Sequence, residues 1–399
     1  MEIQELLKKW EEVLNEGNEI RNYNVKRSTA IMLENEHNFL MEATAFGADS
    51  LGTQAGYATS GMFHKIAVPM VRRTFPELVA HDLVGVQPMT GPVGLAFAIR
   101  FRAGQDYDSS ANVELGYNTI DSAYSGSYTT SAGEVLGSDS SVANRGLGIG
   151  SNAEIKEVNM TVEKAQIEAT TRKLRSRWSL EVAQDLKAMH GLNLEEEMMD
   201  ILAYEITAEI DRELIEKIDA VCVAGGALYD RTWDYAAASG DTIGGRWEME
   251  RYRELYHYIL RRAQDIAINT RRGSGNWVVG NPYSVAIFES MAAFTIAPVA
   301  GNVNTSQVGI SRIGSLDGRL SVYRDTFQSS NQFIVGYKGP SEYDTGVIYL
   351  PYVQLLASRA VFEDSFHPTV GLMSRYGIHD HLYGSKNYYQ KVSLTNLPA

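Results

Sequence analysis

One apolar pattern near the middle of the chain constrains the fold most. Large apolar side chains recur there at every fourth position: Leu194, Met198, Leu202, Ile206, Ile210, Leu214 and Ile218. Four residues advance an α-helix by about 400°, so this stripe drifts slowly around one continuous helix. A helix of about 28 residues is roughly 42 Å long, whereas helices of globular proteins average about 11–12 residues. The fold must therefore be built around one long helical spine.

Capping residues predict where this helix and its neighbours begin and end. Asn193 is the N-cap candidate of the spine. Just before it, residues 179–191 predict a shorter helix that starts at Ser179 and ends at Gly191. Residues 246–273 predict a third helix. Short alternating segments follow, and with no regular strand–helix–strand repeat the chain is assigned to the α+β class.

A long polar stretch interrupts the first half of the chain. Residues 94–102 alternate and predict a strand, and residues 155–178 are again strand-like. Between them, residues 103–155 are dominated by Gly, Ser, Ala, Asn, Thr and Tyr. A stretch of this length is usually functional or disordered. Because it lies between two strands, we favour an excursion from a sheet, ordered against a neighbouring subunit, over a disordered linker.

The N-terminus carries a second amphipathic stripe. Residues 3–16 predict one helix with a single apolar face, made of Ile3, Leu6, Leu7, Trp10, Val13 and Leu14. Residues 1–42 hold 5 Lys/Arg and 9 Asp/Glu, a net charge of −4. We expect a small separate helical unit whose stripe faces a partner. The sequence turns small and nearly neutral across Glu42-Ala43, which indicates either a helix end or a cleavage site.

Composition excludes several classes of function. The net charge of −13 and the absence of Lys/Arg runs longer than two argue against tight nucleic-acid binding. A single cysteine, Cys222, excludes an internal disulfide and fits a reducing compartment. The acidic N-terminus is not a secretory signal, and the uncharged run 84–99 is too short and too rich in Gly, Pro and Gln to span a bilayer. We expect no membrane association.

The sequence contains only weak matches to catalytic motifs. The segment 271–280 contains Gly-x-Gly but lacks the third glycine and follows a helix, so it is not a dinucleotide fingerprint. His379 and His381 could form a metal-binding pair, which leaves a metal-dependent enzyme as an alternative of another class. A pair of surface histidines is the more ordinary explanation. We expect no cofactor and no enzymatic activity.

Several ordered blocks resemble a known family. Residues 71–100 contain "GVQPMTGPVGLAFAIR", and residues 172–192 and 205–215 form a helix pair that ends in the spine. The segments 271–279, 333–353 and 366–378 match later blocks in the same order. Together they resemble the major capsid proteins of T-even-type tailed bacteriophages. The resemblance covers about residues 37–378 and is broken mainly at 103–155.

The resemblance implies a Hong Kong 97-type capsid fold. Its parts would be an N-terminal propeptide, a following arm, an extended loop, a peripheral domain, an axial domain and a C-terminal tail. On this chain the propeptide would be 1–42, the arm 43–70 and the extended loop 101–165. The peripheral domain would combine 71–100, 166–222 and 353–378. The axial domain would be 223–352 and the tail 379–399. The resemblance implies a structural protein that assembles into hexamers, with pentamers left open, and tiles an icosahedral or prolate head around double-stranded DNA without binding it specifically.

The resemblance also gives Glu42-Ala43 a meaning. Members of this family lose a propeptide to a protease that cuts after a hydrophobic-x-Glu pattern, which Leu40, Glu42 and Ala43 match. Two similar patterns end at Glu5 and Glu16, inside the expected N-terminal helix, where cutting requires local unfolding. Glu42 is therefore the preferred site, and the stripe of residues 3–14 would face the scaffold.

The implied partners are other copies of the chain, vertex and portal proteins, the scaffold and maturation protease, and outer decoration proteins. Assembly would occur in the host bacterial cytoplasm and the product would be the virion shell. A pentameric vertex paralogue and an encapsulin-like compartment remain alternatives of the same fold.

Overall fold

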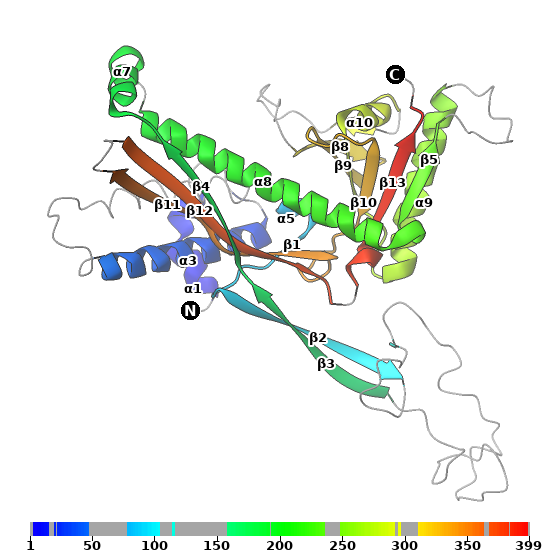
Figure 1. Cartoon of the computed structure of the whole chain (residues 1–399). Coiled ribbons are helices and arrows are strands. Elements are labelled where there is room, and N and C mark those ends of the chain that lie inside the picture. Colours follow the sequence, from blue (N-terminus) through cyan, green and yellow to red (C-terminus); the bar gives the residue numbers. More distant parts are fainter. Residues whose placement is uncertain are drawn as a thin grey trace, which may run out of the picture. The chain divides into compact units, whose positions relative to one another are not determined.

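The structure is a computed structural model of the 399-residue chain, and its described residues form two compact units. It describes residues 3–15, 20, 22–47, 78–103, 114–115, 158–191, 193–235, 248–291, 294–296, 310–362, 367–382 and 384–397. The first unit comprises residues 1–94, 167–266 and 273–399, and the second comprises 95–166 and 267–272 (Figure 1).

The helices of the described residues are the spine, a group at the N-terminus and several shorter or separate ones. The spine is α8 (Leu194–Ala224), which Asn193 caps through its side chain. The N-terminal helices are α1 (Ile3–Lys9), α2 (Glu11–Asn15) and α3 (Tyr23–Gly47). The others are α5 (Ala80–Leu83), α7 (Leu180–His190), α9 (Glu248–Thr270), α10 (Pro282–Glu289) and the 3-10 turns η2 (Gly226–Leu228) and η3 (Ser385–Tyr388). The predicted spine and the helix from Ser179 to Gly191 are thus confirmed, with Gly191 left-handed at φ 68°.

A four-stranded sheet has the order β1-β11-β12-β4. Its strands are β1 (Gly85–Val86), β4 (Thr170–Arg177), β11 (Val347–Phe362) and β12 (His367–Asp380). The pairing of β1 with β11 is parallel, and the other two pairings are antiparallel. The register of β11 against β12 shifts at Pro351–Val353, which leaves Tyr352 without a partner residue in that register. This β-bulge frees a backbone carbonyl for contacts with another element.

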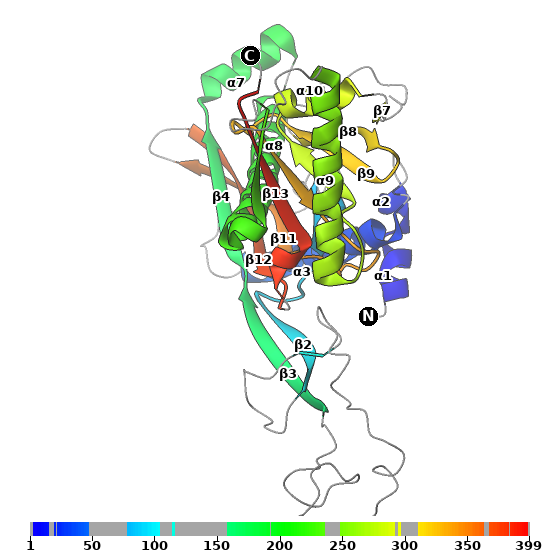
Figure 2. The same ribbon diagram turned by 90° about the vertical axis from the view of Figure 1, so that its right-hand side faces the viewer.

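A seven-stranded sheet has the order β5-β13-β10-β6-β9-β8-β7. Its strands are β5 (Asp230–Asp234), β6 (Trp277–Gly280), β7 (Phe294–Ile296), β8 (Ile310–Leu316), β9 (Leu320–Asp325), β10 (Gln332–Gly336) and β13 (Tyr389–Thr395). Four of its neighbouring pairs are antiparallel, and β5–β13 and β6–β9 are parallel. Mixed sheets of this kind, together with separate helices, confirm the α+β class. Figure 2 shows α9 running alongside this sheet.

The spine helix joins the two sheets. It packs against β12 and β4 of the smaller sheet and against β13 of the larger one (Figure 1). Its apolar side inserts fully buried residues such as Ile206 and Ile210 between them. On the smaller sheet, Arg172 of β4 donates to Glu209 and Glu213 of α8 at 2.8 and 2.7 Å. The apolar stripe is long because the helix must pack against two sheets along its length.

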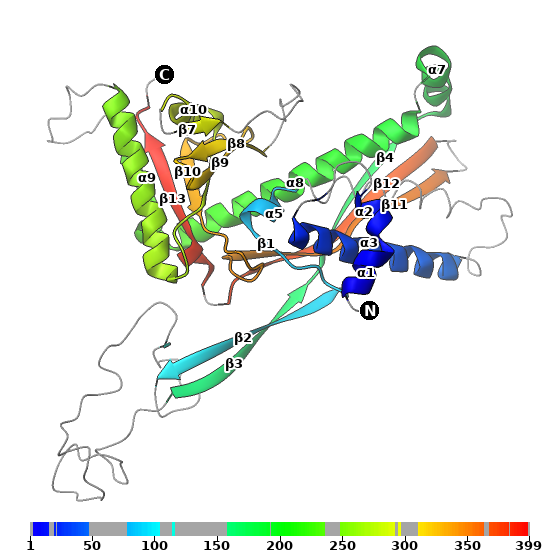
Figure 3. The same cartoon turned by 180° about the vertical axis from the view of Figure 1, so that it is seen from behind.

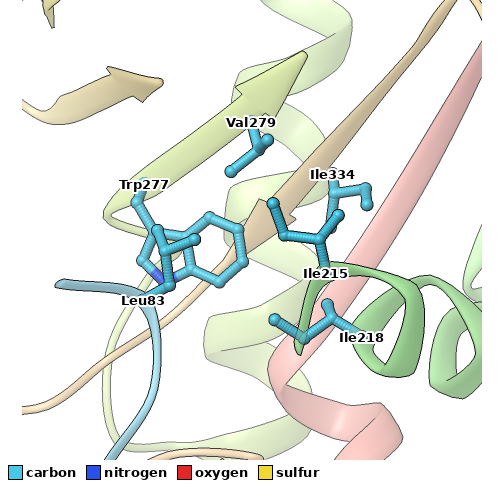
Figure 4. A pocket seen from close by; sticks show the side chains of 6 residues that line it. All are labelled: Leu83, Ile215, Ile218, Trp277, Val279 and Ile334. Atoms are coloured by element: carbon cyan, nitrogen blue, oxygen red, sulfur yellow. The ribbon is translucent and has the colours of Figure 1, made fainter. Parts of the chain in front are cut away.

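The larger sheet buries aromatic side chains in the core. Phe333 of β10 is fully buried and stacks on Phe288 of α10 with ring centroids 4.6 Å apart. Figure 4 shows a pocket elsewhere in the core, lined by Leu83, Ile215, Ile218, Trp277, Val279 and Ile334. All six lining residues are apolar or aromatic, so the pocket offers no charged group to a ligand. It is a packing irregularity of the core.

The second unit contains a two-stranded hairpin. It is formed mainly by β2 (Val93–Ala103) and β3 (Val158–Glu168). The two strands that flank the polar stretch therefore pair with each other, as expected of an excursion from a sheet. Residues 104–113 and 116–157, which hold most of that stretch, lie outside the described residues.

The C-terminal residues differ from the expectation. We expected a tail over 379–399, but these residues include the end of β12, the turn η3 and the strand β13. β13 pairs with both β5 and β10, and its first four residues are buried. A strand with neighbours on both edges and both faces covered need not alternate apolar and polar residues. That is why the mixed sequence Tyr389-Gln390-Lys391-Val392 did not look like a strand.

The spine also carries a buried ion pair whose loss should be costly. Arg212 of α8 donates to the buried carboxylate of Asp325 at 2.9 Å and to the exposed Glu216 at 2.9 Å. Replacing Arg212 with methionine should lower the free energy of unfolding by about 2–4 kcal/mol, because the carboxylate stays buried without a cation. A chemical-denaturation series measures this. Glu216→Gln removes only the exposed partner and should cost less than about 0.5 kcal/mol, so equal effects of the two changes would contradict this explanation.

Candidate cleavage site and assembly surfaces

The predicted cleavage residues lie inside a helix. Leu40, Glu42 and Ala43 all belong to α3, which continues to Gly47. The change of composition at Glu42-Ala43 is therefore not a helix end, since the alanines that follow are good helix formers. The reason for preferring Glu42 over Glu5 was also wrong, because both glutamates are helical. The side chains of residues 39–47 and the arm over 48–70 lie outside the described part of the chain, as does Glu16.

The N-terminal stripe faces its own chain. Trp10 and Leu14 are buried, and Leu7 and Val13 pack against the same core. Residues 3–15 of the predicted helix form not one helix but two, α1 and α2, which both contact α3. The expectation of a separate unit with a partner-facing or scaffold-facing stripe is therefore wrong. The amphipathic pattern was correct, but a sequence pattern does not reveal which surface covers an apolar face.

Polar contacts fix the N-terminal helices in place. The carboxylate of Glu34 accepts hydrogen bonds from Lys9 Nζ at 2.7 Å and from Trp10 Nε1 at 2.9 Å. These contacts lower the pKa of Glu34 against the opposing effect of burial. The side chain of Asn35 donates to the carbonyl of Met89 at 2.9 Å and to that of Tyr352 at 3.3 Å. Helix α3 is thus bound to the four-stranded sheet at the β-bulge (Figure 3).

The hairpin of the second unit has two unlike faces. On one face, Arg100 and Arg102 form ion pairs with Glu163 at 3.0 and 2.6 Å. Since side chains alternate along a strand, the intervening residues share the opposite face. Seven large apolar side chains of that face are 49–64% exposed: Leu95, Phe97, Ile99, Phe101, Val158, Met160 and Val162. We call these seven residues the hairpin apolar face.

This exposed face is the candidate binding surface that sequence reasoning missed. Residues 94–102 were correctly predicted as a strand, but nothing in their pattern said which face would remain uncovered. The sequence signal was the presence of large apolar residues at every second position in 95–101 and in 158–162, which predicts an apolar face but not whether that face is covered. A two-stranded ribbon has little stability of its own in water, so an uncovered apolar face on one indicates a binding surface.

The two candidate histidines lie near and just beyond the end of β12. His379 lies in β12, and burial lowers its pKa. His381 donates its backbone N–H to Gly346 O at 2.9 Å, and its ring lies against Tyr388. No cluster of three or more ligating side chains occurs among the described residues. Within the same residues, no helix is long and apolar enough to cross a bilayer.

Comparison with known proteins now decides the family. The model of the family described as Major capsid protein Gp23 matches residues 60–397. This chain belongs to that major capsid protein family. The protein is thus a phage head-shell protein of a structural family, and the resemblance seen in the ordered sequence blocks is confirmed.

Two major capsid proteins match most of the chain, and a vertex protein and a solved structure show weaker similarity. The major capsid protein of Salmonella phage ViI is 30% identical over 408 residues, covering 94% of this chain and 89% of the relative. That of Vibrio phage KVP40 is 30% identical over 383 residues, covering 77% and 74%. A capsid vertex protein of Enterobacteria phage T4 is 24% identical and covers 57% and 54%. A solved structure described as Microbacterium phage Oxtober96 covers 88% of this chain and 98% of that one, with a TM-score of 0.47 and 8% identity.

Proposed function

We propose that this capsid protein assembles into hexamers that tile an icosahedral or prolate head around double-stranded DNA. The hairpin apolar face carries the proposal, because seven exposed apolar side chains on one ribbon require a protein partner. In a shell made of one repeated chain, the available partner is a second copy. The net charge of −13 suits a shell that encloses DNA without binding it tightly.

The parts of a Hong Kong 97-type subunit can be assigned on this chain as a proposal. The hairpin would be the extended loop, the four-stranded sheet with α8 the peripheral domain, and the seven-stranded sheet the axial domain. Vertex and portal proteins and outer decoration proteins would contact the assembled lattice. Because the N-terminal stripe is buried, we place contact with the scaffold on the exposed charged side of α1 and α2, at Glu5, Lys8, Glu11 and Glu12.

Electron microscopy of the purified full-length chain tests the assembly. Hexameric rings, sheets, tubes or closed shells are the expected result. A protein that stays monomeric at micromolar and higher concentrations, without scaffold or with it, would contradict the proposal.

Proteolytic maturation after Glu42 completes the proposed function. The site lies about a turn from the end of α3 at Gly47, and helix ends open locally at little cost in free energy. The maturation protease would bind residues 40–43 in an unwound form. The cut would remove α1, α2 and most of α3.

Glutamate at position 42 should be required for this cut. In particles made with the phage protease, Glu42→Gln should lower the cleaved fraction by at least about tenfold, since a site built for a carboxylate discriminates against an amide. Mass spectrometry of the N-terminal peptide measures it, with Ala43 as the expected new N-terminus. Glu5→Gln, in the competing Ile3-Gln4-Glu5 pattern, is the matched control and should leave cleavage unchanged. An intact Met1 in mature wild-type particles would refute the cleavage and leave the shell assignment standing.

A further inference from the structure

The N-terminal helices cover one specific face of the four-stranded sheet. Helix α3 packs along β11, and α1 and α2 pack on α3 (Figure 3). Leu14, Met32 and Leu33 are fully buried in this layer and belong to the same core as the sheet. A segment that is only tethered would not bury three large side chains completely. The helices therefore occupy a formed binding site on the sheet.

The site on the sheet fixes the position of α3 through hydrogen bonds, in addition to apolar contacts. Asn35 reaches the carbonyls of Met89 and of Tyr352, the latter at the β-bulge. Unpaired backbone carbonyls in a half-buried place need a donor, and the two N–H groups of one amide supply both. Asn35 thus sets the register of α3 on the sheet.

Two glutamates of α3, two positions apart, have opposite environments. Glu34 is satisfied by Lys9 and Trp10. Glu36 is 1% exposed, and neither of its carboxyl oxygens has a hydrogen-bond partner in the described part of the chain. A buried carboxylate without a partner is strongly unfavourable.

No charged group compensates Glu36 from the described elements around it. The described side chains of β11, over 347–357, include no Asp, Glu, Lys, Arg or His, and neither do residues 85–92. On the helices, Lys9 forms an ion pair with Glu34. His37 also contributes to lowering the pKa of Glu34. The other described charges on these helices are on the exposed residues Glu5, Lys8, Glu11, Glu12 and Arg27, and on Lys26, which donates to Asn15 Oδ1 at 2.9 Å. Burial alone raises the pKa of Glu36 to about 8.

We propose that α1, α2 and residues 23–38 of α3 form a releasable cover for the β11 face of the sheet, held in register by Asn35 and weakened whenever Glu36 ionises. The docked helices keep Glu36 protonated, whereas the undocked segment exposes it to water as an anion. Docking therefore takes up a proton, and release gives one back to solvent.

The direction of the pH effect follows from this linkage. Below the ordinary carboxyl pKa of 4.5, both states are protonated and docking is strongest. As the pH rises from there towards 8, only the undocked state loses its proton, so docking weakens by nearly tenfold for each pH unit. Above about 8 both states are ionised and the effect levels off. At neutral pH the cover is thus already weakened.

This pH-dependent cover extends the proposed maturation, and its biological purpose rests on that proposal. A cut after Glu42 would leave the N-terminal helices attached only by these contacts. A cover that is weak at neutral pH can then leave the subunit, and its departure uncovers the β11 face. The docking and its dependence on Glu36 hold for the uncut chain as well, so they can be tested without any cleavage.

Hydrogen exchange of the uncut full-length chain, followed by mass spectrometry from pH 5.5 to 8, tests the proposal. After correction for the intrinsic exchange rate, the opening constant of the amides in residues 25–36 should rise on the order of a hundredfold in the wild type. In Glu36→Gln it should stay nearly constant, and at pH 8 it should lie far below the wild-type value. The matched control Glu34→Gln should open these amides more at every pH and keep the pH dependence, because it loses the negative charge that pairs with Lys9.

Titration of Asp211 cannot imitate this result. Burial also raises the pKa of Asp211 to about 7, but Asp211 lies on α8, and the change at Glu36 leaves it in place. A wild type and a Glu36→Gln variant with the same pH dependence in residues 25–36 would overturn the proposal. So would faster opening of Glu36→Gln than of the wild type at pH 8. Either result would leave cleavage after Glu42 untouched, since no cut is involved.

Discussion

Replacing Phe97 with lysine is expected to raise the concentration needed for shell assembly by at least about a hundredfold, with the stability of the isolated chain nearly unchanged. Phe97 is 64% exposed in the middle of the hairpin apolar face. Burying a phenylalanine against a second subunit contributes about 2–3 kcal/mol, and about 2.8 kcal/mol corresponds to a hundredfold change in an equilibrium constant. A buried ammonium without a partner adds to this loss.

Sedimentation or light scattering against protein concentration measures the effect. Phe97→Leu keeps an apolar side chain of similar reach and should assemble within a few-fold of the wild type. Lys164→Gln, on the same face but already polar, should also change little. If Phe97→Lys assembled as readily as Phe97→Leu, the hairpin apolar face would not be an intersubunit surface.

The largest expected loss of stability comes from truncating Phe333. Its side chain is fully buried in β10, against Phe288. Phe333→Ala removes that ring and leaves a cavity between α10 and the seven-stranded sheet, which should lower the free energy of unfolding by about 3–5 kcal/mol. Phe327, only a few residues earlier, is 51% exposed, so Phe327→Ala should cost less than about 0.5 kcal/mol.

The measurement is a guanidinium titration of both variants. Carrying it out in the Phe97→Lys background should keep the chain unassembled, so that subunit association does not contribute to the midpoint. Similar costs for the two phenylalanines would mean that β10 is not a core strand.

The two apolar faces of the subunit would become available at different stages. Assembly would use the hairpin apolar face, which is already exposed, whereas maturation would expose the β11 face, which the N-terminal helices cover. The cover is held by specific contacts at Asn35 and Glu34 and is weakened by the unpaired Glu36. A precursor built in this way presents its second apolar face only after processing.

The sequence alone determined the features whose causes are local. The fourfold spacing of apolar residues predicted α8 because the period of a helix is fixed by backbone geometry, and Asn193, Ser179 and Gly191 marked helix ends through caps that involve only nearby residues. Alternation in 94–102 predicted β2 for the same reason. The ordered blocks were also enough to identify the capsid family.

Tertiary structure decided everything that depends on what lies opposite a residue. The stripe of Trp10 and Leu14 and the stripe of Phe97 look alike in sequence, but one is covered by the chain's own core and the other is left exposed. Glu34 and Glu36 are the same amino acid on one helix, yet only Glu34 meets a lysine and an indole. Burial and pairing are set by contacts between residues far apart in the chain, and no local pattern records them.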